Sequence, residues 1–465
     1  MDTFNDKSCV DSIIESYLKR NKTIIENIIK TYNSPCYVYL DNIIKYKYKI
    51  FIEAFEQLSH KNRKLYYACK ANTNSTILKI LKDLGVAGID CVSLGEVYIA
   101  QKVGFKEDQI LYTGNNNSLK ELKEVYDKNI LINFNEVEAL EQFCKTFNLA
   151  NFEICVRIDY GVGLGSHDYV KTAGIFNKFG VKIHELPKLF EVMIKFNLSL
   201  VGLHQHSGSN IKDQIDYYNM VKRTVDNLKH IIALYEKCYN INHLKDLKFI
   251  NFGGGFGVQY TTKEQNLEIT NLFKDLDSLL TSNKEKINDN VTIIFEPGRY
   301  LTAECGLLIT EVTSIRKFDK DNVFLGCNTG INHLIRPALY GSFHNIINLT
   351  KNYNFFSNKV DNNIQCSNGI MEKEKNTDIV SISIYGNICE SSDFFIKDFL
   401  VKKEEFTIDM GDLLVILNCG AYGYSMASTY NSRLLPAEVL IKSDKDYLIR
   451  KRQSYEDLIG LNIFT

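Results

Sequence analysis

The sequence predicts a parallel (β/α)8 barrel of the α/β class, followed by a second and mostly antiparallel β domain. Eight short runs rich in β-branched and aromatic residues alternate with stretches of helical periodicity over about 240 residues, which is the usual size of such a barrel. After residue 300, strand-like runs continue without regular helices between them. The chain has 465 residues, enough for two or three domains. A doubly wound open sheet is the alternative fold, and the number of strands favours the barrel.

Each expected strand is an apolar run bounded by polar or glycine residues, and each expected helix repeats apolar residues every three or four positions. A first helix is expected over 10–30. The barrel strands are expected at 65–70, 88–93, 109–113, 130–134, 153–158, 200–206, 249–253 and 292–296. Helices are expected between them at 75–84, 94–103, 119–126, 136–147, 185–196, 213–236 and 265–280. Later strands are expected at 307–315, 379–384, 413–418 and 437–441.

These elements give three expected parts of the chain. An N-terminal segment covers 1–40, the barrel covers 41–300, and the β domain covers 301–465. Within the β domain, residues 351–377 are rich in Asn and Lys, which is typical of a surface insertion.

Composition excludes several classes of protein. Lys and Arg number 55 against 56 Asp and Glu, a net charge of −1 that gives no overall basic surface for nucleic acid. No apolar run approaches the ~18 residues of a membrane span, and the first residues lack the pattern of a secretory signal. The twelve cysteines are scattered without zinc-like spacing, which predicts free thiols, no metal site and a cytoplasmic location.

Polar residues end several of the expected barrel strands, where the active sites of such barrels lie. Lys70 ends the first strand, and partial desolvation there would make its amine a nucleophile for a carbonyl group. Asp90 ends the second. Taken alone, each could be an ordinary strand-end polar residue.

Two histidines end the sixth strand. His204 and His206 are two residues apart and are therefore expected on one face of the strand. No carboxylate or cysteine lies close to them in the sequence, so a ring stacked on a planar cofactor is favoured over a metal site. A buried core histidine is the alternative for at least one of them. Ser209 follows in the turn and can donate a hydrogen bond to an anion.

The last two strands end in residues that suit a phosphate. Gly253, Gly254 and Gly255 follow the seventh strand, and successive glycines let backbone N–H groups converge on an anion. Glu296 ends the eighth strand, with Arg299 just beyond it. A lysine for an aldehyde, a carboxylate for a pyridine nitrogen, and glycines with an arginine for a phosphate together indicate pyridoxal 5′-phosphate.

From about Pro35 to its end, the sequence resembles the pyridoxal-phosphate decarboxylases of the alanine-racemase fold (fold type III), and within them the diaminopimelate decarboxylases. The resemblance rests on the order and combination of many short motifs. They are YACKAN at 67–72, YTGN at 112–115, KFG at 178–180, HQHSGS at 204–209, GGG at 253–255, EPGR at 296–299, LIRPALY at 334–340, CESSD at 389–393 and GAYG at 420–423.

The resemblance implies a role for each matching residue. Lys70 binds the cofactor covalently, and Cys389 of the partner subunit in a homodimer gives the proton to the substrate. The other expected cofactor-binding residues are Asp90, His206, Ser209, Gly253, Gly254, Gly255, Glu296, Gly298, Arg299 and Tyr422. The expected substrate-binding residues are Arg299, Arg336, Tyr340, Glu390 and Tyr422. The N-terminal segment is expected to join the β domain.

The expected reaction is decarboxylation of meso-2,6-diaminopimelate to L-lysine and CO2, the last step of lysine biosynthesis. Glu296 favours a decarboxylase over a racemase of this fold, which has an arginine at that position and a weaker electron sink. Arg336 and Arg299 suit the distal carboxylate of this substrate and Glu390 its distal ammonium. The alternatives are a polyamine-pathway decarboxylase acting on carboxynorspermidine, arginine or ornithine, and a non-catalytic homologue that only binds the cofactor.

Two positions depart from the family pattern. Asn328 stands where the family often has an acidic residue two before the glycine, and Ser207 replaces an aliphatic residue in the histidine motif. Neither change removes a catalytic group, but both leave room for a modified or different substrate.

Overall fold

The computed structural model describes residues 10–463 apart from 162, 166–176, 240–246, 262–263, 286, 288, 320, 356–378 and 404–405. The chain forms two compact units. The barrel unit consists of residues 44–259 and 265–302, and the β unit consists of the residues up to 43, 260–264 and those from 303 onward. The limits expected from the sequence, at residues 40 and 300, lie beside these. Most of the expected insertion at 351–377 lies outside the described residues.

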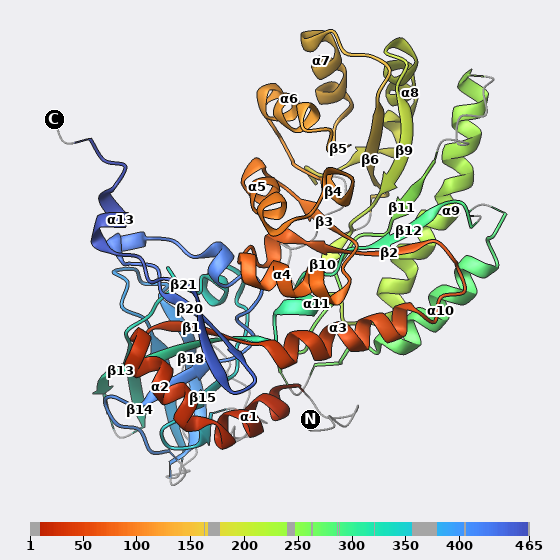
Figure 1. The fold of residues 1–465 in the computed structure, drawn as a ribbon. Helices are drawn as coiled ribbons and strands as arrows, with labels where there is room; N and C mark the ends of the chain where they lie inside the picture. Colours follow the sequence, from red (N-terminus) through yellow and green to blue (C-terminus); the bar gives the residue numbers. More distant parts are fainter. Residues whose placement is uncertain are drawn as a thin grey trace. The chain divides into compact units, whose positions relative to one another are not determined.

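Eight parallel strands close the barrel unit. They are β2 (Arg63–Ala68), β3 (Gly88–Cys91), β4 (Ile110–Tyr112), β5 (Leu131–Phe134), β6 (Glu153–Asp159), β9 (Ser199–His204), β11 (Phe249–Asn251) and β12 (Thr292–Phe295). Each pairs with the next in this order, and β12 pairs with β2 to complete the ring. Figure 1 labels these strands. The barrel predicted from the sequence is therefore confirmed.

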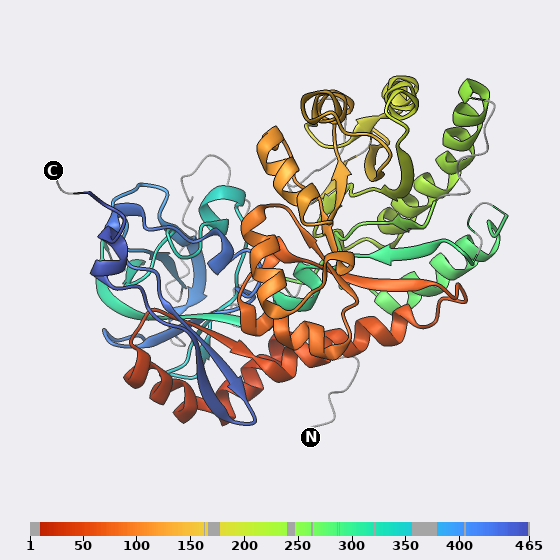
Figure 2. The same cartoon turned by 45° about the horizontal axis from the view of Figure 1, so that its top comes forward.

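Helices surround these strands (Figure 2). They are α3 (Asp41–Phe55), α4 (Ser75–Leu84), α5 (Leu94–Val103), α6 (Leu119–Asp127), α7 (Val137–Phe147), α8 (Leu186–Lys195), α9 (Gln214–Tyr239), α10 (Ile269–Thr281) and α11 (Arg299–Thr302). Shorter elements are β7 (Leu164–Gly165), β8 (Val181–Lys182), β10 (Gly208–Ser209), and the 3-10 turns η1 (Cys69–Ala71), η2 (Glu107–Gln109) and η4 (Ile183–Glu185). Side-chain caps explain why α4 and α5 begin where the sequence predicts. Asn74 accepts a hydrogen bond from the N–H of Thr76, and Ser93 accepts one from the N–H of Glu96.

Aromatic rings form a core beside the last two barrel strands. The ring centroids of Phe252 and Phe295 lie 5.4 Å apart, and the ring of Phe273 on α10 lies 5.4 Å from that of Phe295. Phe51 of α3 packs edge-on against Phe256 at 4.9 Å. Because Phe252 directly precedes the three glycines and Phe295 directly precedes Glu296, this packing fixes the start of two loops that carry candidate site residues.

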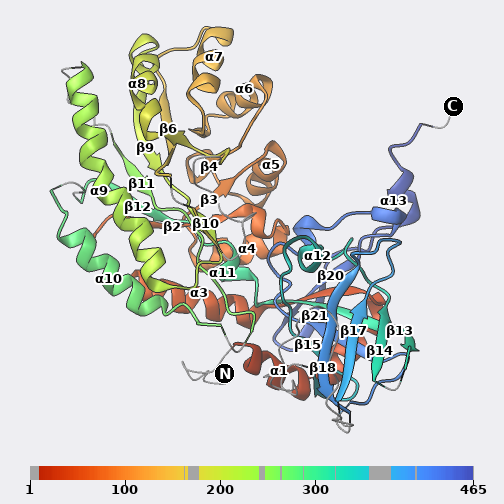
Figure 3. The same cartoon turned by 180° about the vertical axis from the view of Figure 1, so that it is seen from behind.

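A ten-stranded sheet forms most of the β unit. Its main path runs β16 (Tyr353–Asn354), β15 (Ile346–Asn348), β19 (Leu413–Ile416), β13 (Gly306–Lys317), β1 (Cys36–Leu40), β20 (Ala437–Lys442) and β21 (Lys445–Arg450). A branch from β13 adds β14 (Asn322–Cys327), β17 (Ile379–Tyr385) and β18 (Phe394–Lys402), which lie side by side in Figure 3. Only the β1–β20 and β14–β17 pairs are parallel among the described strands of this sheet. The mostly antiparallel β domain is therefore confirmed.

The N-terminal segment differs from its prediction. The single helix expected over 10–30 is two helices, α1 (Val10–Arg20) and α2 (Lys22–Tyr32), because the backbone leaves the helical conformation at Asn21 (φ −112°, ψ 24°). Strand β1 follows and is buried along its whole length. The remaining elements are α12 (Arg336–Tyr340), α13 (Tyr455–Ile459), η7 (Tyr424–Met426) and η8 (Tyr430–Ser432). None of the described helices has the length and apolar character needed to cross a membrane.

Candidate active site

Lys70 lies in the turn η1 and not at the end of the first barrel strand, where the sequence placed it. The pairing of β2 with β3 ends with Ala68 and Asp90, and the chain then makes a 3-10 turn in which the N–H of Asn72 bonds the carbonyl of Cys69. Lys70 Nζ lies 4.0 Å from Asp90 Oδ2. The lysine side chain is 35% exposed and that of Asp90 is fully buried, so the amine is accessible beside a buried carboxyl group.

Burial and the nearby carboxylate of Glu296 raise the pKa of Asp90 to about 6. Glu296, which follows β12, behaves in the opposite way. One of its oxygens lies 3.1 Å from His204 Nε2, and the other accepts a 2.8 Å hydrogen bond from Asn251 Nδ2. Burial alone would raise the pKa of Glu296, but His204 and Lys70 outweigh it and hold the pKa at about 2. Glu296 is therefore a buried but ionised carboxylate at neutral pH.

His206 is not on the same strand as His204, because β9 ends at His204. The two rings have different partners. His206 Nδ1 accepts a hydrogen bond of 3.2 Å from the N–H of Gly254, whereas His204 pairs with Glu296. Burial, with Lys70 and Arg157 nearby, holds the pKa of His206 well below its usual value. The ring is therefore neutral, and its accepting Nδ1 assigns the proton to Nε2.

The three glycines after β11 form a tight loop. Gly253 and Gly255 have φ of +75° and +93°, a region that favours glycine. A Cβ on Gly254 would stand 2.5 Å from the carbonyl oxygen of Glu296. Two of the three N–H groups already have acceptors within the barrel unit, because Gly253 donates to Asn251 Oδ1 and Gly254 donates to His206 Nδ1. The N–H of Gly255 has no acceptor within the described part of the chain.

Arg299 and Ser209 meet close to this loop. Arg299 Nη2 donates a hydrogen bond of 3.0 Å to Ser209 Oγ, and Arg299 is only 6% exposed. A Cβ on Gly255 would lie 2.6 Å from the carbonyl oxygen of Gly208, so the loops after β9 and β11 are in contact. A guanidinium, a hydroxyl and a backbone N–H are thereby gathered where an anion can bind.

Gly298 allows the loop after β12 to approach the lysine turn. A Cβ at this position would lie 3.0 Å from the Cβ of Ala71 and 3.1 Å from that of Ala68. These two alanines flank the turn that carries Lys70. Small residues on both sides therefore bring the Glu296 loop against η1.

The barrel unit thus brings ten of the candidate residues onto the ends of neighbouring strands. They are Lys70, Asp90, His206, Ser209, Gly253, Gly254, Gly255, Glu296, Gly298 and Arg299. The set fits pyridoxal phosphate, since it offers an amine for the aldehyde, a buried ionised carboxylate for a protonated ring nitrogen, and donors for the phosphate. Sequence reasoning assigned no role to Asn251, although its place two residues before the glycines was a usable signal.

The other five candidates belong to the β unit, where α12 carries two of them. Arg336 begins α12, is 5% exposed and donates a 3.2 Å hydrogen bond from Nη2 to Ser342 Oγ. Its guanidinium lies over the rings of Tyr260 and Tyr340, at 5.6 and 5.8 Å from their centroids. These contacts hold the guanidinium in one place. A substrate carboxylate could bind the guanidinium beside the Ser342 hydroxyl or in place of it.

Cys389 and Glu390 lie in the loop between β17 and β18, and both side chains are exposed. The loop itself is firmly held. Buried Asp393 accepts hydrogen bonds of 2.7 Å from the N–H groups of Ile331 and Ile388, and the N–H of Cys389 donates to Asn431 Oδ1 at 2.6 Å. An exposed thiol and an exposed carboxylate are therefore presented on a rigid loop.

Tyr422, the fifth candidate, lies after β19 in a left-handed backbone conformation, with φ of +57°. A tyrosine rarely adopts this conformation, and such strain is found most often at functional sites.

The two departures from the family pattern have local structural roles. Asn328 Oδ1 accepts hydrogen bonds from Thr310 Oγ1 at 2.8 Å and from the N–H of Glu311 at 3.1 Å. Ser207 Oγ donates to Gln205 Oε1 at 3.0 Å. Both side chains therefore form hydrogen bonds with polar groups of their own unit.

A barrel of this kind, with a lysine, a buried carboxylate and an anion site at its strand ends, defines a pyridoxal-phosphate enzyme. The model of the pyridoxal-binding domain of pyridoxal-dependent decarboxylases matches residues 43–303. The chain therefore belongs to the pyridoxal-dependent decarboxylase family, and pyridoxal phosphate is its cofactor.

Individual relatives narrow this class. The chain is 34% identical over 437 residues to the diaminopimelate decarboxylase of Methanothermobacter thermautotrophicus, with 92% of each chain covered. The structure of Helicobacter pylori diaminopimelate decarboxylase complexed with L-lysine is 32% identical, with a TM-score of 0.76 and coverage of 94% of this chain and 98% of that one. The M. jannaschii diaminopimelate decarboxylase in complex with L-lysine is 29% identical, with a TM-score of 0.77 and 94% of each chain covered.

Proposed function

We propose that this chain decarboxylates meso-2,6-diaminopimelate to L-lysine and CO2, the last step of lysine biosynthesis. The observation that carries the reaction type is the buried Glu296 carboxylate, whose lowered pKa keeps it ionised. The choice of substrate rests on the relatives named above, with which the chain is colinear over 92% of its length.

Different barrel residues are assigned to different groups of the cofactor. Bound pyridoxal phosphate supplies an electron sink for the electron pair that CO2 leaves behind. Lys70 would hold its aldehyde, and the ionised Glu296 carboxylate would keep a proton on the pyridine nitrogen so that the electron sink stays strong. Arg299, Ser209 and the N–H of Gly255 would hold the phosphate. The neutral ring of His206 would pack against the cofactor without adding a competing charge.

The β-unit residues are assigned to the substrate. Arg336 binds the distal carboxylate, supported by the Tyr340 ring beside it, and Glu390 binds the distal ammonium. Tyr422 would contact both substrate and cofactor. Cys389 would supply the proton that replaces the lost carboxyl group at Cα, a role that suits an exposed thiol on a loop held by hydrogen bonds.

The sharpest test of the substrate is CO2 release from a panel of amino acids. We expect meso-diaminopimelate to be turned over at least tenfold faster, by kcat/KM, than ornithine, arginine or carboxynorspermidine. L-lysine, the expected product, serves as the negative control. Faster release from one of the other three substrates would replace the proposal with a polyamine-pathway decarboxylase, and no release from any would indicate a non-catalytic homologue.

We also propose a homodimer in the cytoplasm, in which Cys389 of one subunit serves the Lys70 of its partner. A two-fold interface builds two identical sites, so each would combine residues of both chains. When Lys70→Ala and Cys389→Ala subunits are mixed, random exchange makes about half the dimers hybrid, and each hybrid has one intact site, so roughly a quarter of all sites recover.

The assay is decarboxylation before and after exchange, with each variant alone as the control. Mass spectrometry confirms that hybrids have formed. If hybrids form and no activity returns, Lys70 and Cys389 act within one chain and the shared site is wrong.

A further inference from the structure

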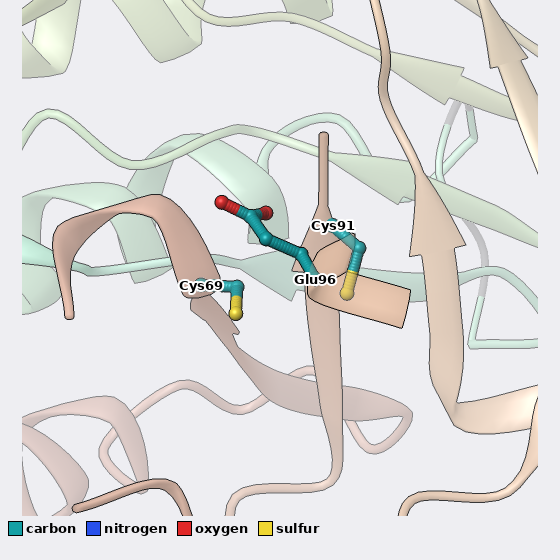
Figure 4. A group of neighbouring side chains, drawn as sticks. All are labelled: Cys69, Cys91 and Glu96. Atoms are coloured by element: carbon teal, nitrogen blue, oxygen red, sulfur yellow. The ribbon is translucent and has the colours of Figure 1, made fainter. Parts of the chain in front are cut away.

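Two buried thiols and a carboxylate meet next to Lys70 in a cluster that the proposed reaction does not use. Cys69 is the first residue of η1, Cys91 is the last residue of β3, and Glu96 lies in the first turn of α5. Their ligand atoms all lie within 4.8 Å of one another (Figure 4). Each of three separate elements therefore contributes one possible metal ligand to the same point.

The three groups are acids that lie close together and away from bulk solvent. Cys69 and Cys91 are buried, and Glu96 is partly buried. At this spacing the ionised forms of the three groups repel one another, and a bound divalent cation removes that repulsion.

Local structure also fixes the carboxylate in place. Glu96 Oε2 accepts a 2.8 Å hydrogen bond from the N–H of Val92, while the N–H of Glu96 donates to Ser93 Oγ at 3.2 Å. These two hydrogen bonds turn the Glu96 side chain back toward the end of β3, where Cys91 lies. Oε1 remains available for a second contact.

The ligand types select the metal. Zinc binds thiolate sulfur at about 2.3 Å and carboxylate oxygen at about 2.0–2.2 Å in a tetrahedron, which places its ligand atoms roughly 3.5–4 Å apart. The cluster needs only a small contraction from its 4.8 Å envelope to reach that spacing. Two soft thiolates disfavour magnesium and calcium, which prefer oxygen ligands.

We propose that Cys69, Cys91 and Glu96 form a zinc site with one position left for water. Binding releases the protons of the two thiols to solvent, with no change in oxidation state. Because Cys69 directly precedes Lys70, an occupied site ties the turn that carries the lysine to β3 and α5.

The test measures zinc in the full-length protein with its cofactor bound. The protein is dialysed against zinc chloride with a non-thiol reductant that keeps all cysteines reduced, and then against metal-free buffer. We expect about one zinc per chain by atomic emission, and an X-ray absorption spectrum with two sulfur neighbours at about 2.3 Å.

Two variants and a matched control decide the assignment. Cys91→Ala should lose the retained zinc, and Glu96→Gln should weaken its binding at least tenfold while keeping the fold, as checked by circular dichroism. Cys144→Ala removes a buried thiol on α7 instead and should keep one zinc. Absence of zinc from the reduced wild-type protein, or an equal zinc content in wild-type, Cys91→Ala and Glu96→Gln proteins, would overturn the proposal.

Discussion

In the barrel unit the Glu296 side chain is 2% exposed and has two hydrogen-bonding partners, whereas in the β unit the side chains of Cys389 and Glu390 are exposed. Both regions have rigid backbones, since aromatic packing holds one and buried Asp393 holds the other. The difference is whether the ionisation state of the functional groups is already fixed by residues of the same unit. The barrel already sets the ionisation state of its key groups.

A buried charge persists only if fixed partners compensate for the loss of water, so the state of Glu296 is a property of the barrel unit alone. An exposed carboxylate such as Glu390 binds a charged partner only weakly in water. It binds strongly and selectively only when a ligand or another chain excludes solvent from it. Substitutions in the barrel should therefore alter the attachment or the ionisation state of the cofactor. Substitutions in the β-unit loop should alter which substrate is preferred. The following predictions test that division in order of expected size.

The largest effect is expected for Lys70. Lys70→Ala should lower kcat by about a thousandfold or more, because the amine proposed to hold and position the cofactor is lost. Borohydride reduction of the wild-type protein should fix the pyridoxyl group on the peptide that contains Lys70, as read by mass spectrometry. A label on a different lysine would show that the residue in η1 is not the one that binds the cofactor.

Glu296 should follow. Glu296→Ala should retain the bound cofactor but lower decarboxylation by roughly 100- to 1000-fold, the usual cost of removing a fixed electrostatic partner. Glu438→Gln is the matched control, because Glu438 is an equally buried carboxylate that accepts from Tyr39 in the β sheet. It should lower stability and leave kcat unchanged. Parental decarboxylation by Glu296→Ala would disprove the electron-sink role.

Glu390→Gln should act on the substrate and not on the cofactor. Loss of a charged partner costs roughly 2–5 kcal/mol when the site is desolvated, so kcat/KM for meso-diaminopimelate should fall well over tenfold. The cofactor absorbance should stay unchanged. Ser391→Ala, which removes a neighbour that donates to Glu390 at 3.2 Å, should have little effect. A near-normal kcat/KM in Glu390→Gln would place this side chain outside the site.

The last prediction concerns the acid stability of the β unit and not its part in catalysis. Burial lowers the pKa of His333 to about 4, and its Nε2 bonds the carbonyl of Leu434 at 3.1 Å. Between pH 6.5 and 4 the unfolded chain takes up a proton that the folded chain does not, so stability should fall by on the order of 3 kcal/mol as the pH drops.

In His333→Gln that loss should be absent. Urea unfolding at a series of pH values measures the difference between the two proteins, and pH 8 is the reference because both side chains are then neutral. An identical slope in both proteins would show that other groups cause the acid sensitivity.

Much of the fold could be predicted from the sequence because each barrel strand is a local apolar run. One failure depended on partners far away in the chain, and another on a local break that the apolar pattern does not reveal. Strand β1 was missed because its neighbours, β13 and β20, lie hundreds of residues later. The break at Asn21 was missed because the apolar pattern continues across it.

The candidate site was predictable as a set of residue types but not as a set of contacts. Lys70 was placed on a strand, since the sequence does not show that the pairing of β2 with β3 stops at Ala68. The partners of Glu296 could not be read either, because His204 and Asn251 come from two other strands. The proximity of Cys69 and Cys91 likewise follows only from the register of adjacent strands.

The position of β1 in its sheet also affects how the chain is made. Its residues 36–40 are translated early, yet they pair with residues 306–309 and 437–441. During synthesis the whole barrel emerges before either neighbour of this apolar strand has been made. Such late, long-range pairing is slow and leaves the edges of β1 unpaired, so we expect this segment to need protection by chaperones during folding.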